Sequence, residues 1–165
     1  MDAINRLESQ ARLEHAHQVL GDFLRTDQWY PQPLDGLRGF RSNYNGQSGY
    51  YRITAYIAEP SEILLCYAYA GFYVPAERRA AAAEFLTRAN YNLVLGNFEL
   101  DYRDGEVRCK ASLAFADEAL TEGLISQVIY VPPRHMDTYI AGLLAVVYGQ
   151  ADPAAEIVRI EGGEA

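Results

Sequence analysis

The chain has 165 residues, of which 50% are hydrophobic, and its net charge at pH 7 is −8. This length suits one domain, residues 1–165, and this hydrophobic content excludes a disordered chain, which buries too little apolar surface to fold. The negative charge disfavours nucleic acid and anionic membranes as partners, because binding to either needs clustered basic side chains.

The pattern at the N-terminus predicts an amphipathic helix over residues 3–25, within an N-terminal helical segment of residues 1–28. Apolar side chains recur there at helical spacing and would face a core: Leu13, Ala16, Leu20, Phe23 and Leu24, with Ile4 and Leu7 continuing the stripe. The segment Trp29-Tyr30-Pro31-Gln32-Pro33 ends the helix, because proline lacks an amide donor and restricts the residue before it.

Three strand signals follow the helix. Residues 37–44 form the first, and the turn residues of 43–49 predict a hairpin to the second, residues 50–59. That second segment alternates strictly, with four apolar side chains on one face: Tyr51, Ile53, Ala55 and Ile57. Residues 63–72 are apolar on both faces, which predicts a strand in the centre of the sheet or one covered on both sides.

A second helix begins after Pro75, since proline is tolerated in a first helical turn. Its buried stripe consists of Ala82, Phe85, Leu86 and Ala89. A hairpin of residues 97–103 and 106–115 comes next, and Asp104-Gly105 predicts a two-residue turn between the strands. Phe98, Leu100 and Tyr102 point one way in the first of these strands. We expect one shared core face made by Phe98, Leu100, Val107, Cys109, Leu113 and Phe115 with Phe85 and Leu144.

The last third of the chain is helical. One stretch is marked by Leu120, Leu124, Ile125, Val128 and Ile129, and the next by Met136, Tyr139, Ile140, Leu143, Leu144 and Val147. Pro132-Pro133 lies between them and should break or kink the rod. Asp152-Pro153 starts a short final helix through Ile157, and we expect residues 161–165 to be a frayed tail.

The resulting order is α-β-β-β-α-β-β-α. Strands that come in hairpin runs indicate an α+β fold, here a twisted antiparallel sheet with helices packed on it.

We expect no enzyme activity, no metal, no nucleotide and no other cofactor, because the residue patterns of such sites are missing. His15 and His17 diverge by about 200° on a helix, so they cannot share an ion, and His135 has no partner nearby in the sequence. The segment Gly46-Gln47-Ser48-Gly49 lacks the glycine spacing of a nucleophile elbow and reads as a hairpin turn. Asp101 and Asp104 lie on a strand surface and in a turn, which argues against a catalytic pair.

The 13 tyrosines suit half-buried sheet faces or a contact surface, and we favour the sheet faces. Cys66 and Cys109 fall inside predicted strands, where free thiols behave as small hydrophobes; a disulfide between them is the less favoured alternative. No apolar run reaches the length of a membrane span and the first residues lack a signal pattern, so we expect a cytoplasmic protein.

Several motifs in the second half resemble the YbjN family of bacterial proteins, also described as sensory transduction regulators. They are Phe85-Leu86-Thr87-Arg88-Ala89-Asn90, Leu95-Gly96-Asn97-Phe98-Glu99-Leu100 and Asp104-Gly105-Glu106-Val107, with Asp137, Tyr139 and Ile140 and the closing Val147-Tyr148-Gly149 before Asp152-Pro153. The resemblance covers about residues 35–160. It implies a fold similar to the small chaperones of type III secretion, in which a dimer with helices on one side of the sheet holds an unfolded partner segment. It also implies no catalytic residues, and Pro132-Pro133 departs from its pattern, which puts in doubt a dimer built on a long straight helix.

Two functions from different classes stay open, and an uncharacterised enzyme has least support. The first is a non-enzymatic regulator, adaptor or chaperone-like domain that binds a protein segment, since residues 63–72 carry more apolar surface than one chain can cover. The second is a small-molecule binding domain, with a pocket between the sheet and the closing helices where tyrosine hydroxyls converge with Arg41 or Arg52. We also expect a homodimer, and the partner or dimer surface would be Leu65, Tyr67 and Tyr69.

Overall fold

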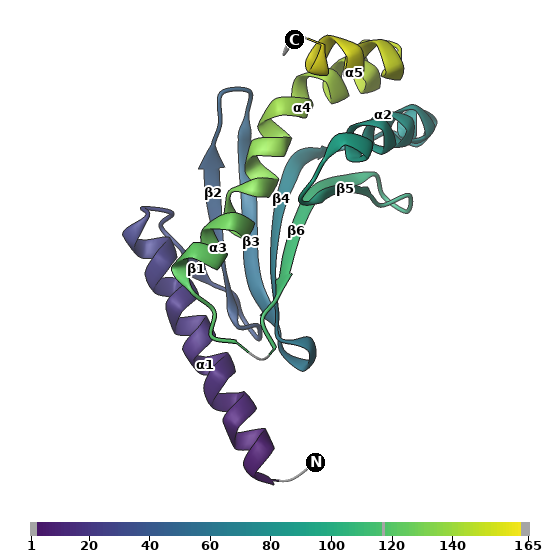
Figure 1. The fold of residues 1–165 in the computed structure, drawn as a ribbon. Helices are drawn as coiled ribbons and strands as arrows, with labels where there is room; N and C mark the ends of the chain where they lie inside the picture. The colour runs from purple at the N-terminus through teal and green to yellow at the C-terminus, as the bar shows by residue number, and fades with distance from the viewer. Residues whose placement is uncertain (1–2, 117, 163–165) are drawn as a thin grey trace.

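The computed structural model describes residues 3–116 and 118–162, which form one antiparallel sheet and a set of helices (Figure 1). The strands are β1 (Gln32–Pro33), β2 (Gly39–Asn45), β3 (Tyr50–Ala58), β4 (Ile63–Tyr73), β5 (Asn97–Leu100) and β6 (Glu106–Ala114). The helices are α1 (Ala3–Thr26), α2 (Arg79–Asn92), α3 (Glu122–Ile129), α4 (Val131–Tyr148) and α5 (Pro153–Glu161), with 3₁₀ turns at Glu59–Ser61 and Ala76–Arg78. The α+β class and the order of elements agree with the sequence prediction, except for the two-residue β1, which the prediction left in a connection.

The sheet has the strand order β1-β2-β3-β4-β6-β5, and every neighbouring pair is antiparallel. β4 therefore lies between β3 and β6, as its apolar sequence predicts. In Figure 1, α3 and α4 cross one side of the sheet, α1 packs against α3 and against β2 and β3, and α2 and α5 lie at the opposite end. The helices of the described residues thus leave the other side of the sheet uncovered.

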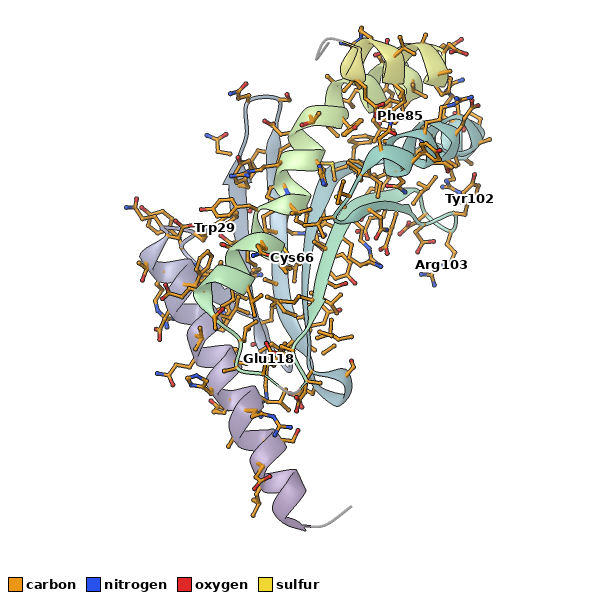
Figure 2. The ribbon with its side chains drawn as sticks, in the orientation of Figure 1. Trp29, Cys66, Phe85, Tyr102, Arg103 and Glu118 are labelled. Atoms are coloured by element: carbon orange, nitrogen blue, oxygen red, sulfur yellow. The ribbon has the colours of Figure 1, made fainter. Side chains whose placement is uncertain are left out.

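The side of the sheet that faces the helices carries the core. Alternation in β3 buries the four predicted side chains, and β4 contributes Leu64, Cys66 and Ala68, all fully buried. Both cysteines are free thiols on this side, and burial raises the pKa of each. Figure 2 places Cys66 at the middle of the sheet, where its thiol lies 3.8 Å from the carbonyl oxygen of Ile129.

Most side chains of the predicted helical stripes are buried, and Phe23 and Leu124 are partly buried against the core, but Leu7 and Leu144 are exposed. Leu7 is 72% exposed, because the first turns of α1 extend beyond the strands (Figure 1), and the side chain of Ile4 lies outside the described residues. Leu144 is 37% exposed and does not join Phe85 in the core, so that part of the prediction is wrong. Leu143, one residue earlier on α4, is buried instead.

The β5–β6 turn is longer than predicted. Asp101 and Glu106 close the hairpin through a 2.9 Å backbone hydrogen bond, which leaves a loop of residues 102–105 rather than a two-residue turn. β5 ends at Leu100 and Tyr102 is 57% exposed, so Tyr102 does not continue the inward row. The reason is Gly105: its φ is +90°, and a Cβ there would lie 2.1 Å from the carbonyl oxygen of Val74.

Pro132-Pro133 begins a helix instead of kinking one. α3 ends at Ile129 and α4 begins at Val131, so the break falls at Tyr130. Both prolines lie in the first turn of α4, where backbone amides have no partner within the helix. The missing proline amides therefore cost α4 nothing.

The final helix follows its predicted signal. The side chain of Asp152 accepts a 2.9 Å hydrogen bond from the amide of Ala155 and caps α5. The helix runs four residues beyond Ile157, so Glu161 is its last residue rather than part of a frayed tail. Residues 163–165 lie outside the described residues.

Candidate functional site

The uncovered side of the sheet, which we call the outer face, is the candidate site. The register aligns its side chains in rows across the strands: Arg52, Tyr69, Arg108 and Glu99 form one row, and Thr54, Tyr67 and Lys110 the next. Leu65 lies beside Tyr56 in the following row. The structure therefore brings the three predicted residues, Leu65, Tyr67 and Tyr69, onto one face at the sheet centre.

Arginine side chains lie on the tyrosine rings of the outer face. The guanidinium carbon of Arg52 is 4.1 Å from the ring centroid of Tyr69, and that of Arg108 is 4.3 Å from the centroid of Tyr67. Tyr67 also stacks on Tyr56 at 6.1 Å. These neighbours leave Tyr67 only 8% exposed. The expectation that residues 63–72 carry more apolar surface than one chain can cover therefore needs correction at Tyr67, because the chain's own side chains shield this ring.

The burial of Tyr67 has an electrostatic consequence. Desolvation, together with the hydrogen bond to Tyr56, raises the pKa of Tyr67 to about 12, although the charge of Arg108 acts in the opposite direction. The hydroxyl therefore stays protonated throughout the physiological range.

Glu99 organises the basic side chains of β6. Its carboxylate accepts hydrogen bonds from Arg108 at 2.7 Å and from Lys110 at 2.6 Å. Burial alone would raise the pKa of Glu99, but the bonds from Lys110 and Arg108 outweigh it, and the pKa lies below its usual value. Glu99 therefore stays charged and holds both cations in place.

The outer face is basic on an acidic protein. Four basic side chains (Arg41, Arg52, Arg108 and Lys110) and two acidic ones (Glu99 and Glu106) give it a net charge of +2, in a chain of net charge −8. Glu106 is only weakly engaged, at 3.8 Å from Arg52. Alternation along β3 and β6 places Arg52, Arg108 and Lys110 opposite the buried side chains, and the strand register shows that they meet.

Arg41 and Arg52 share a concavity, although not where the small-molecule hypothesis placed it. A cavity of about 380 Å³ at the β1–β2 edge is lined by Tyr30, Gln32, Arg41, Ser42, Asn43 and Arg52. Between the sheet and α3–α4 the space is filled by buried side chains, among them Leu64, Ile129, Met136 and Leu143.

The residues considered for catalysis or metal binding have structural contacts. His17 stacks on Phe40 at 4.9 Å, with its pKa lowered mainly by burial, while His15 is exposed. His135 Nε2 donates to the carbonyl of Leu95 at 2.9 Å. Among the described residues, no group of three or more histidine, cysteine, aspartate or glutamate side chains could hold a metal ion.

The Gly46–Gly49 segment is the hairpin turn that the sequence predicts. The amide of Gly46 donates to the carbonyl of Gly49 at 2.9 Å. Asp137 of α4 accepts from the amides of Gln47 and Ser48 and from the hydroxyl of Tyr51, which pins the hairpin to the helix. Within the described part of the chain, no helix has the length and apolarity needed to cross a membrane.

Comparisons with known proteins agree with this architecture. No curated protein sequence matches the chain. Among solved structures, it is similar to "YbjN, a putative transcription regulator from E. coli", with a TM-score of 0.60 and 13% identity over 81% of this chain and 92% of that one. It is also similar to a chain of the ExsC-ExsE complex, with a TM-score of 0.51 and 16% identity over 79% and 95% of the two chains.

These likenesses confirm the predicted fold class. The sequence profile of the YbjN family, described as "Putative bacterial sensory transduction regulator", matches residues 18–145, which overlaps the resemblance expected over residues 35–160. The chain belongs to the YbjN family.

Proposed function

We propose that the chain is a non-enzymatic, chaperone-like adaptor or regulatory domain whose outer face binds an acidic protein segment. The observation that carries this proposal is the outer face itself: an uncovered sheet surface with a charge opposite to that of the whole chain. The regulator description of the family and the similarity to a chain of the ExsC-ExsE complex support a protein-binding role.

The composition of the outer face suits a protein partner. Tyrosine and arginine are the residue types most enriched where truncation weakens protein–protein binding. The side chain of Arg52 is 60% exposed, so its guanidinium can donate hydrogen bonds to a carboxylate while still lying on Tyr69. Acidic side chains on a partner would complement this row and speed association.

The test is a charge reversal on the outer face. Immobilised wild type and the double variant Arg41→Glu with Arg52→Glu are compared for the proteins that they retain from a bacterial lysate. An exposed arginine on another surface, in Arg88→Glu, serves as the matched control. We expect an acidic protein that wild type and the control retain and the double variant loses, with binding that weakens as salt rises. Identical retention by all three proteins would refute the role of the outer face.

The homodimer expected from the sequence stays a prediction. A face-to-face contact centred on Tyr67 would bring two outer faces of net positive charge together, which disfavours the outer face as the dimer interface. A charge on the outer face at Tyr69, in Tyr69→Glu, tests such an interface more cleanly than Tyr67→Glu, because Tyr67 is buried within its own chain and Tyr67→Glu would also destabilise the monomer. Light scattering of the wild type at high micromolar concentration decides the oligomeric state. We place the protein's action in the cytoplasm, where thiols such as Cys66 stay reduced.

A further inference from the structure

A second concavity lies where three distant parts of the chain meet. It has a volume of about 470 Å³ and is bordered by the end of α1, by the β2–β3 hairpin and by the α3–α4 junction. Its walls are rich in aromatic side chains: Trp29, Tyr30, Tyr44, Tyr50 and Tyr130. Figure 2 shows Trp29 between the end of α1 and the sheet. We call this concavity the aromatic cavity.

Two unusual sequence features converge in the aromatic cavity. The segment that ends α1 supplies Trp29 and Tyr30, and the helix break before Pro132-Pro133 supplies Tyr130. If α1 or the α3–α4 pair were a continuous helix, neither the segment after α1 nor the break at Tyr130 would exist. Their meeting at one place suggests that the local fold serves the cavity.

Asp27 fixes the inner wall. Its carboxylate Oδ2 accepts a 2.8 Å hydrogen bond from the indole Nε1 of Trp29 and a second from the hydroxyl of Tyr130. The Trp29 ring lies 5.5 Å from Tyr130, edge to face, and 5.8 Å from Tyr44, stacked. The rings are therefore held around a carboxylate in a set geometry.

The outer wall is built on strained backbone. Gln28 and Tyr30 have φ of +59° and +51°, which costs free energy for residues other than glycine. Tyr30 is 78% exposed, and Tyr50, which also lines the cavity, is 64% exposed. Exposed rings contribute nothing to the core, so folding alone does not account for this arrangement.

The lining selects positive charge. Aromatic faces are electron-rich, Asp27 adds a carboxylate, and Gln28, Asn43 and Asn45 add neutral amides. Among the residues that the structure describes, no basic side chain lines the aromatic cavity. A cation already uses one of its rings from a neighbouring cavity: the guanidinium of Arg134 lies 5.0 Å from the centroid of Tyr130. The geometry points to the aromatic cavity as a binding site for an organic cation, an ammonium or guanidinium group of side-chain size.

The chain carries its own reporter for this site, because Trp29 is its single tryptophan. Tryptophan fluorescence is followed during titration with choline, N-acetyl-lysine amide and N-acetyl-arginine amide. The neutral isostere of choline, 3,3-dimethyl-1-butanol, separates charge from shape. Backbone amide shifts of residues 27–30 and 43–50 are recorded in the same titrations, so that binding without a fluorescence change is also detected.

We expect a saturable change in the fluorescence or the amide shifts with the cations, and no change with the neutral isostere. Tyr50→Ala removes one exposed ring and should weaken binding about fivefold, the equivalent of one cation–π contact. Tyr91→Ala, which removes a 90% exposed ring on α2, should leave binding unchanged. Preference for choline would indicate a free metabolite, and preference for an amide a side chain of a partner protein. Equal binding of the neutral isostere, or no change with any cation in either measurement, would overturn the inference.

Discussion

Asn90 of α2 places its carboxamide against the outer edge of β5, where it pairs with the backbone of Phe98. Its Nδ2 donates to the carbonyl of Phe98 at 3.1 Å, and its Oδ1 accepts from the amide of Phe98 at 2.7 Å. These two bonds occupy the positions that a further strand would use. A helix side chain thus closes one edge of the sheet, and such edges otherwise invite pairing with other chains.

We predict that Asn90→Ala lowers the free energy of unfolding by about 1–3 kcal/mol, because it leaves the partly buried amide of Phe98 without a partner and its carbonyl with only a 3.3 Å hydrogen bond from the side chain of Asn97. It should also increase aggregation, since the β5 edge becomes available. Denaturant unfolding and light scattering measure the two effects. Asn92→Ala on the same helix, whose side chain bonds Glu161 at the surface, is the control and should change stability by less than about 0.5 kcal/mol. Equal effects of the two changes would contradict the role of Asn90.

Neighbouring leucines of α4 test the packing of that helix. Leu143 is 1% exposed and Leu144 is 37% exposed. We predict that Leu143→Ala costs about 2–5 kcal/mol through lost burial and a cavity, while Leu144→Ala costs under about 1 kcal/mol. Urea denaturation of both variants measures these costs. A larger cost for Leu144→Ala than for Leu143→Ala would mean that α4 is rotated from the described position.

Two glycines with positive φ, Gly36 and Gly105, allow the cost of backbone strain to be measured apart from the cost of crowding. Gly36, with φ +72°, has no atom within 4 Å of the place that an added Cβ would occupy, whereas at Gly105 a Cβ would collide with the backbone of Val74. We predict a cost of about 1 kcal/mol for Gly36→Ala and a larger one for Gly105→Ala. Thermal unfolding compares them, and similar melting temperatures would show that the 102–105 loop adapts freely.

The elements of the fold could be predicted because their local patterns agree with the packing that they enter. The alternation of Tyr51, Ile53, Ala55 and Ile57 fixes the buried face of β3, and the stripe from Ala82 to Ala89 fixes that of α2. The wrong details depend on distant contacts. The length of the β5–β6 turn is set by Val74 against Gly105, and β1 exists only because β2 lies beside it.

The candidate sites were less predictable. The sequence identified Leu65, Tyr67 and Tyr69 as one face, but the shielding of Tyr67 by Arg108 requires the register between β4 and β6. The aromatic cavity joins Asp27, Tyr50 and Tyr130 across about a hundred residues of sequence, and no local pattern connects them. In the sequence its parts stand out only as a helix end and a proline pair.

Glu62 links α1 to the turn between β3 and β4, and it gives stability a dependence on pH. It is 6% exposed, and its Oε1 accepts hydrogen bonds from Ser9 at 2.8 Å and from Arg12 at 3.0 Å. Burial alone would raise the pKa of Glu62, but the bonds from Ser9 and Arg12 outweigh it and lower the pKa. The carboxylate is therefore stabilised in the folded state.

We predict that Glu62→Gln lowers the free energy of unfolding by about 1–3 kcal/mol at pH 7, where it replaces a hydrogen-bonded carboxylate by a neutral amide. Because the folded-state pKa lies below the unfolded one, the contribution of Glu62 is fully present above the unfolded pKa, about 4.3, and is lost as the pH falls through the folded value. The difference in the free energy of unfolding between wild type and Glu62→Gln should therefore be constant near neutral pH and shrink below about pH 4. Urea denaturation across this range measures it, with the exposed Glu77→Gln as control. A difference that stays constant down to pH 3, or that grows on acidification, would show that the charge of Glu62 does not hold α1 to the sheet.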